Sequence, residues 1–127
     1  LIGVGSISLV VAGVSILNVM LMSTIERREE IGVLRAVGYQ RLDVLRIVLT
    51  EAMLLGLIGG VVGATLSVAS GLLINHLMLG DATQAITLRN AGYVLAAMFF
   101  GVVTSVVSGL YPAYKAANEQ PVDALRQ

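Results

Sequence analysis

The stretch ERREEIGVLRAVG, which runs from Glu26 to Gly38, sets the interpretation of the whole chain. It holds three acids and three bases, and it lies between long segments that carry almost no charge. Charges are costly to bury in an apolar environment, so this segment must lie in water or against a protein partner. It is therefore the place where we expect the chain to receive a signal.

The segments outside this stretch are apolar enough to face lipid. The chain has 127 residues, of which 57% are hydrophobic and 13% charged, and its mean hydropathy is +0.89. Leu1 to Ile25, Ala52 to Asn75 and Asn90 to Tyr114 contain no charged residue, and each can cross about 30 Å of hydrocarbon as a helix. A soluble three-helix core is the alternative, but soluble helices carry a polar stripe that these segments lack.

We therefore predict an all-α integral membrane protein with three transmembrane helices and a short amphipathic helix between the first and the second. The predicted spans are about 1–25, 47–76 and 90–114, the short helix is about 26–38, and a tail follows at 115–127. Five of the eight basic residues lie between the first two spans and two follow the third. Because short loops rich in Lys and Arg stay in the cytoplasm, we expect both charged segments on that side.

The charged stretch has the signals of a separate helix. Ser-Thr-Ile-Glu from Ser23 to Glu26 has the pattern of a capping box, and Gly38 is placed to end the helix in the left-handed conformation. At about 100° per residue, Arg28 and Arg35 lie opposite an apolar arc formed by Ile31, Val33, Leu34 and Val37. Glu26 and Glu30 fall within that arc, so a polar protein partner suits it better than lipid alone.

A further helix is predicted to begin at Gln40 and to continue without a break into the second span. Glu51 has no base three or four residues away on this helix. We expect a partner from another segment, with Arg35 and Arg28 as the candidates. The alternative is that Glu51 reaches interfacial water, because acids near the end of a span cost less than acids at its centre.

Small residues recur at three- and four-residue steps in all three spans, which favours close helix packing. The predicted packing residues are Gly56, Gly60, Gly63, Gly101, Ser105 and Gly109. The first span offers a stripe of Gly5, Ser8, Ala12, Ser15 and Asn18. The alternative is that glycine is simply common in transmembrane helices. Pro112 is expected to bend the last turn of the third span.

Several functional classes find no support in the residues. The only histidine, His76, lies at the predicted outer boundary with no acid nearby except Asp81, so we assign no catalytic residue and no metal ligand. No span has an ionisable residue at its centre, as ion-coupled carriers normally do. The chain has no cysteine, and its net charge of zero gives no reason to expect nucleic acid as a partner.

Three motifs together carry a family resemblance. They are TIERREEIGVLRAVG (Thr24 to Gly38), LTEAMLLG around Glu51, and PAYKAANEQPVDALR (Pro112 to Arg126). The chain strongly resembles the FtsX-like permease family, the membrane subunits of MacB-type ABC transporters. The resemblance implies that Leu1 to Ile25 is the family's second helix. It also implies that the family's first span and its extracytoplasmic domain are absent from this sequence.

The resemblance further implies a multi-pass permease of the inner membrane that couples ATP hydrolysis to a conformational change, for export or for transmitting force. The ATPase would be a separate subunit or domain that holds ATP and Mg²⁺, since the chain has no Walker A pattern. A second copy, or a similar permease, would pair with it. The implied ATPase-coupling residues are Glu26, Arg27, Arg28, Glu29, Glu30, Ile31, Gly32, Val33, Leu34, Arg35, Ala36, Val37 and Gly38. A membrane anchor or scaffold without transport is the alternative.

Overall fold

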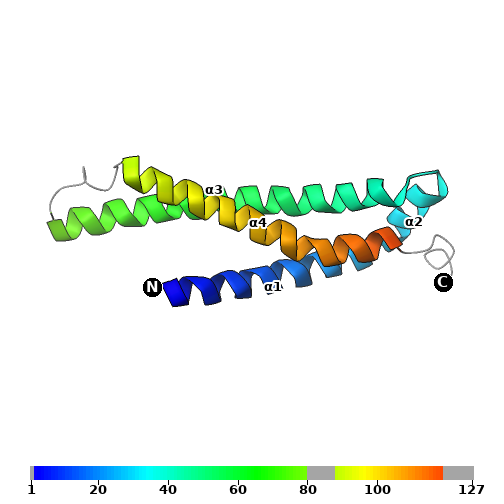
Figure 1. Cartoon of the computed structure of the whole chain (residues 1–127), viewed down its shortest axis with the longest axis horizontal. Coiled ribbons are helices and arrows are strands. Elements are labelled where there is room, and N and C mark those ends of the chain that lie inside the picture. The colour runs from blue at the N-terminus through cyan, green and yellow to red at the C-terminus, as the bar shows by residue number, and fades with distance from the viewer. Residues whose placement is uncertain (1, 80–87, 119–127) are drawn as a thin grey trace.

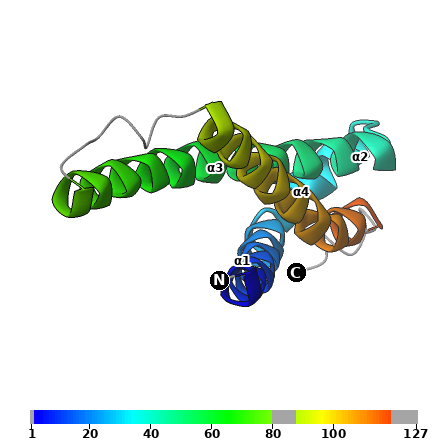
Figure 2. The same cartoon turned by 60° about the vertical axis from the view of Figure 1, so that its left-hand side comes forward.

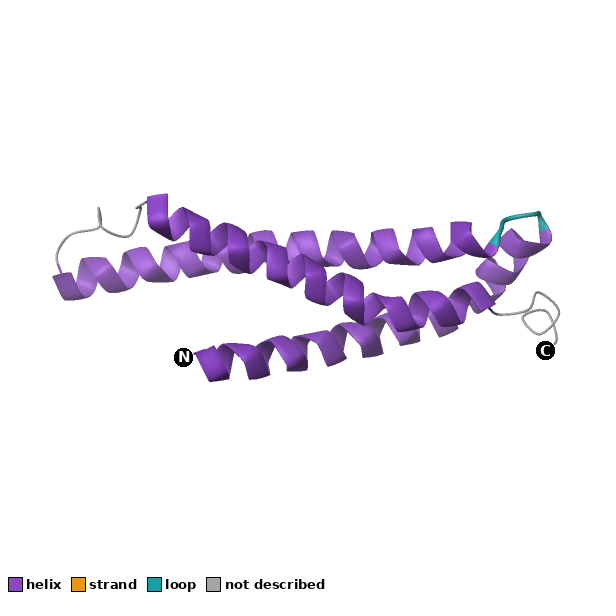
Figure 3. Cartoon of the chain, viewed as in Figure 1, coloured by secondary structure: helices purple, strands orange, loops and turns teal. Residues whose placement is uncertain are grey.

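The computed structural model describes residues 2–79 and 88–118, and these form four helices (Figures 1 and 3). The helices are α1 (Ile2–Glu26), α2 (Arg28–Ala36), α3 (Arg41–Leu79) and α4 (Leu88–Asn118). Within the described residues, α1, α3 and α4 are long and apolar enough to cross a membrane, which confirms the predicted class. Most of the predicted outer loop (80–87) and of the tail (119–127) lies outside the described residues.

The second span belongs to a helix that is longer than a bilayer needs. α3 has 39 residues, which at 1.5 Å per residue is about 58 Å, against about 30 Å of hydrocarbon. It begins at Arg41, directly after Gln40, whose backbone N–H donates to a carboxylate oxygen of Asp43 at 3.0 Å. The predicted continuous helix from Gln40 into the second span is thus confirmed.

α4 lies between α1 and α3. α4 packs against both α3 and α1, and Figure 2 shows it crossing between them. α4 changes direction in its orange, C-terminal part, which contains the buried Pro112 (Figure 1). A proline inside a helix removes one backbone hydrogen bond, so a bend in this part agrees with the prediction.

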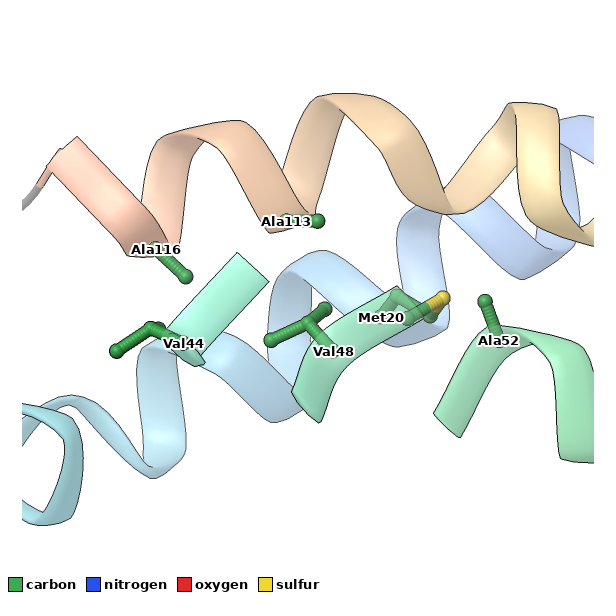
Figure 4. Close-up of a cluster of buried hydrophobic side chains, with 6 residues drawn as sticks. All are labelled: Met20, Val44, Val48, Ala52, Ala113 and Ala116. Carbon is green, nitrogen blue, oxygen red and sulfur yellow. The ribbon is translucent and has the colours of Figure 1, made fainter. Parts of the chain in front are cut away.

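The core lies at the end of the bundle next to α2. Met20 from α1, Val44, Val48 and Ala52 from α3, and Ala113 and Ala116 from α4 form one buried cluster (Figure 4). In the most apolar 18-residue stretch of each long helix, only 11–17% is buried inside the chain. The rest of that apolar surface is left for lipid or for other helices, as expected for membrane spans.

Candidate functional site

The charged segment begins with a break in the helix at Arg27. Arg27 has φ −95° and ψ 14° and separates α1 from α2, so Glu26 is the last residue of α1. The predicted capping box is wrong, because Ser23 lies inside α1 and the residue that precedes α2 is Arg27, which makes no side-chain capping hydrogen bond. The Arg27 N–H donates to Ser23 O at 3.1 Å, so this donor is satisfied by the preceding helix.

Arg27 also provides the partner of Glu51. Its Nη1 lies 3.3 Å from Glu51 Oε2, and its Nε lies 3.5 Å from Glu30 Oε2. The expectation of a partner from another segment is confirmed, and that partner is Arg27, which was not among the candidates Arg35 and Arg28. The break places Arg27, which directly precedes α2, beside α3. Both side chains are about half exposed, 51% and 42%, so the pair orients α2 more than it stabilises the fold.

The other end of α2 is closed by Gly38, as the pattern predicts. Gly38 has φ 111°, a value that favours glycine. The Gly38 N–H donates to Arg35 O at 3.2 Å and the Tyr39 N–H to Leu34 O at 3.1 Å, which is the Schellman pattern of hydrogen bonds. α2 is therefore a short helix with a defined beginning and end, from Arg28 to Ala36.

The predicted faces of α2 are wrong. Gly32 is buried and Ile31 and Leu34 are half-buried, with Ile31 packed on the core cluster, but Arg28 and Arg35 are half-buried on the same inner side. Val33 and Val37 are 52% and 77% exposed. The apolar arc is thus split, and the outer face of α2 consists of Glu29, Glu30, Val33, Ala36 and Val37.

The physical reason for this inversion lies at the C-terminal end of α4. Arg35 Nη1 donates to the carbonyl oxygen of Ala117 at 2.6 Å, and Arg41 Nη1 donates to Asn118 Oδ1 at 3.2 Å. The last four carbonyls of a helix have no partner within it, and a cation is favourable there. Hydrophobic periodicity cannot reveal such a contact, because the acceptor is a backbone group far along the chain.

The predicted packing glycines divide into two groups. At Gly56, a Cβ would lie 2.9 Å from Ser105 Cβ, and at Gly109 it would lie 2.7 Å from Ala52 Cβ, so both glycines allow α3 and α4 to touch. The hydroxyl of Ser105 is buried and donates to Ala52 O at 2.5 Å. Gly60 makes an ordinary contact with Met98.

Gly63 and Gly101 do not pack within the described part of the chain, since a Cβ at either would meet nothing within 4 Å. Gly63 lies one turn beyond Gly60 on α3, and Gly101 lies between Met98 and Ser105 on α4 but on another side of that helix. Both glycines line an apolar groove of about 520 Å³ between α1, α3 and α4. On α1 as well, the small residue that packs closely against α4 is not one of the predicted stripe. Gly13, which the spacing did not select, is buried, and a Cβ there would lie 3.0 Å from Ser108 Oγ.

The described residues thus define a multi-pass helical membrane protein with a short charged helix held between its first and second spans. The chain belongs to the FtsX-like permease family: the family described as FtsX-like permease C-terminal matches residues 2–121. This confirms the family that the three motifs predict.

The chain is also similar to named export proteins. It is 40% identical over 123 residues to the macrolide export ATP-binding/permease protein MacB of Bdellovibrio bacteriovorus, and 43% identical over 119 residues to MacB of Acinetobacter baylyi. It is 41% identical over 122 residues to the pyoverdine export ATP-binding/permease protein PvdT of Pseudomonas entomophila. These alignments cover 94–97% of this chain but only 18% of each relative.

Proposed function

We propose that this chain is the membrane-spanning part of an ABC transporter permease, in which α2 receives the motion of an ATP-binding domain or subunit. The relatives carry both ATP-binding and permease functions in their names, and this chain matches less than a fifth of their length. ATP and Mg²⁺ would be held by the ATP-binding part, and hydrolysis would occur there. The membrane would be the inner membrane, with α2 on its cytoplasmic side.

One observation carries the proposal: the outer face of α2 is apolar in its middle and acidic at its edge. Val33 and Val37 are one turn apart and exposed, and Glu29 and Glu30 lie beside them. Exposed valines on a short helix closed by Gly38 suit a groove with an apolar floor and a basic rim. The docking face is therefore smaller than the whole stretch from Glu26 to Gly38, because Arg28, Gly32 and Arg35 face inward.

The test is to place a charge on this face. Val33→Asp is expected to weaken capture of the ATP-binding partner by about ten-fold, because a buried unpaired carboxylate in an interface costs more than 1.4 kcal/mol. Leu42→Asp, at an exposed leucine at the start of α3, is the matched control and should capture the partner normally. If Val33→Asp changes neither capture nor ATPase activity, the scaffold alternative is favoured.

We also propose that the permease pairs with a second copy or with a similar permease. Gly63 and Gly101 leave a strip of helix backbone accessible in the groove, where another helix can approach closely. With no native cysteine, Gly101→Cys should crosslink two copies in the membrane. Val107→Cys, exposed on α4 but outside the groove lining, controls for random collisions. Equal crosslinking of the two variants would contradict pairing through the groove.

A further inference from the structure

We infer that Arg35 is the residue through which a displacement of α2 reaches α4. The inference rests on the proposed function, in which α2 receives the motion of the ATPase. Arg35 would not itself contact the ATPase, because it is half-buried on the inner side of α2. It is a positioning residue that acts on the C-terminal end of α4.

α4 depends on such a contact more than the other two spans do. α2 is joined to α1 through Arg27 alone and to α3 through the turn at residues 37–40, so the backbone itself carries its motion to both. Ala117, by contrast, lies 82 residues beyond Arg35 along the chain. Any movement of α2 can reach α4 only through non-covalent contacts.

The contact made by Arg35 has the properties needed for this task. The Arg35 Nη1 to Ala117 O distance is 2.6 Å and the pair is partly buried, whereas the Arg27–Glu51 pair is longer, 3.3 Å, and half exposed. A guanidinium that donates to a helix-terminal carbonyl is a charge-assisted hydrogen bond, which also suits the negative end of the helix dipole. Water and salt screen such a partly buried contact less than an exposed one.

The acceptor belongs to a part of α4 that is packed against the buried core. Ala113 and Ala116 are fully buried and Ala117 is 3% exposed, so the last turns of α4 lie against the core. Ile31, one turn before Arg35 and on the same side of α2, packs on that cluster. A pull on the Ala117 carbonyl is thus transmitted to the buried alanines and, through them, along α4.

The test uses the permease assembled with its ATP-binding domain or subunit in lipid nanodiscs. We expect Arg35→Met to capture the ATP-binding partner normally but to lose about ten-fold in permease-dependent stimulation of ATPase activity and in transport, the scale of one charged hydrogen bond. Arg35→Lys should recover most of this loss, because an ammonium can also donate to helix-terminal carbonyls. Arg46→Met, at an exposed arginine of α3, is the matched control.

A distance measurement separates transmission from simple stabilisation. The chain has no cysteine, so spin labels at Tyr39→Cys, whose amide closes the end of α2, and at Tyr114→Cys on α4 are unique within this chain. Both side chains are exposed and lie outside the outer face of α2. In the otherwise unchanged permease, the distance between the labels should stay the same with and without ATP, because the two helices move together. In Arg35→Met it should change or broaden when ATP binds.

The outcomes distinguish this inference from the proposed function. If the label distance changes on ATP binding while Arg35 is present, or if Arg35→Met keeps full stimulation, the inference is overturned even when Val33→Asp abolishes capture. If neither the unchanged permease nor Val33→Asp shows any dependence on the ATP-binding partner, the proposed function is overturned, and the inference with it.

Discussion

At the residue scale, the contact between α3 and α4 depends on two glycines, whose lack of a Cβ lets the helices approach closely. Ala52 Cβ lies where α4 has only the hydrogen of Gly109, and Ser105 Cβ lies where α3 has only Gly56. The same approach brings the Ser105 hydroxyl within 2.5 Å of the Ala52 carbonyl. In lipid, where apolar burial gives no drive for helices to associate, this close packing and the hydrogen bond hold the two helices together.

Gly109→Ala is therefore expected to destabilise the bundle. Its Cβ would lie 2.7 Å from Ala52 Cβ and 3.2 Å from Met20 Sδ, and since the alanine is fixed on its helix, α3 and α4 must move apart. Overpacking of this kind costs about 1–3 kcal/mol. Reversible unfolding in detergent or bicelles measures it. Gly63→Ala is the control and should be neutral or slightly stabilising, since nothing lies within 4 Å.

A glycine is favoured at position 38 because of its backbone conformation, and not because a side chain there would meet a neighbouring residue. Its φ is 111° and a Cβ there would meet nothing within 4 Å, so a substitution tests the backbone alone. We expect Gly38→Ala to cost about 1–2 kcal/mol and to loosen the end of α2. Hydrogen exchange of the Gly38 and Tyr39 amides, which close the helix, would show faster exchange. An unchanged exchange rate in Gly38→Ala would contradict this role.

At the element scale, α2 shows how far the sequence predicts this molecule. The long apolar helices, the helix between them and its end at Gly38 all follow from local patterns of charge, hydrophobicity and glycine. The faces of α2 and the partner of Glu51 do not, because Arg35 and Arg27 are oriented by groups on α4 and α3. Periodicity also cannot select Gly13 or reject Gly101, since the crossing points of the helices decide which small residues touch.

The ion pair between Arg27 and Glu51 should contribute to the position of α2 with little effect on stability. Glu51→Arg is expected to separate the start of α2 from α3, and the exchanged pair Arg27→Glu with Glu51→Arg should restore the contact. A double-mutant cycle should give a coupling of about 0.2–1 kcal/mol that decreases as salt is added, because both side chains are half exposed. A coupling near zero at low salt would favour interfacial water as the partner of Glu51.

At the scale of the whole molecule, the helices are tightly packed at the end of the bundle next to α2 and are separated by a groove towards the other end. The buried cluster, the two arginine contacts with α4 and the ion pair of Arg27 all lie near α2. Towards the other end, α3 and α4 separate, and the groove lined by Gly63 and Gly101 lies between them and α1. Under the proposed function, a displacement that enters through α2 would therefore act first on the tightly packed end of the bundle.

A disulfide across α3 and α4 tests this arrangement. A Cβ built at Gly60 lies 3.7 Å from Met98 Cβ, close to the mean of about 3.8 Å in disulfides. With no other cysteine in the chain, Gly60→Cys with Met98→Cys should form an intramolecular bond under mild oxidation, seen as loss of two maleimide-reactive thiols. Gly63→Cys with Met98→Cys should form little disulfide, because nothing lies within 4 Å of a Cβ at Gly63.

If α3 and α4 spread during each ATP cycle, oxidation of the first pair should stop transport and reduction should restore it. Full transport by the oxidised protein would mean that the crossing stays closed and that motion leaves the bundle by another route.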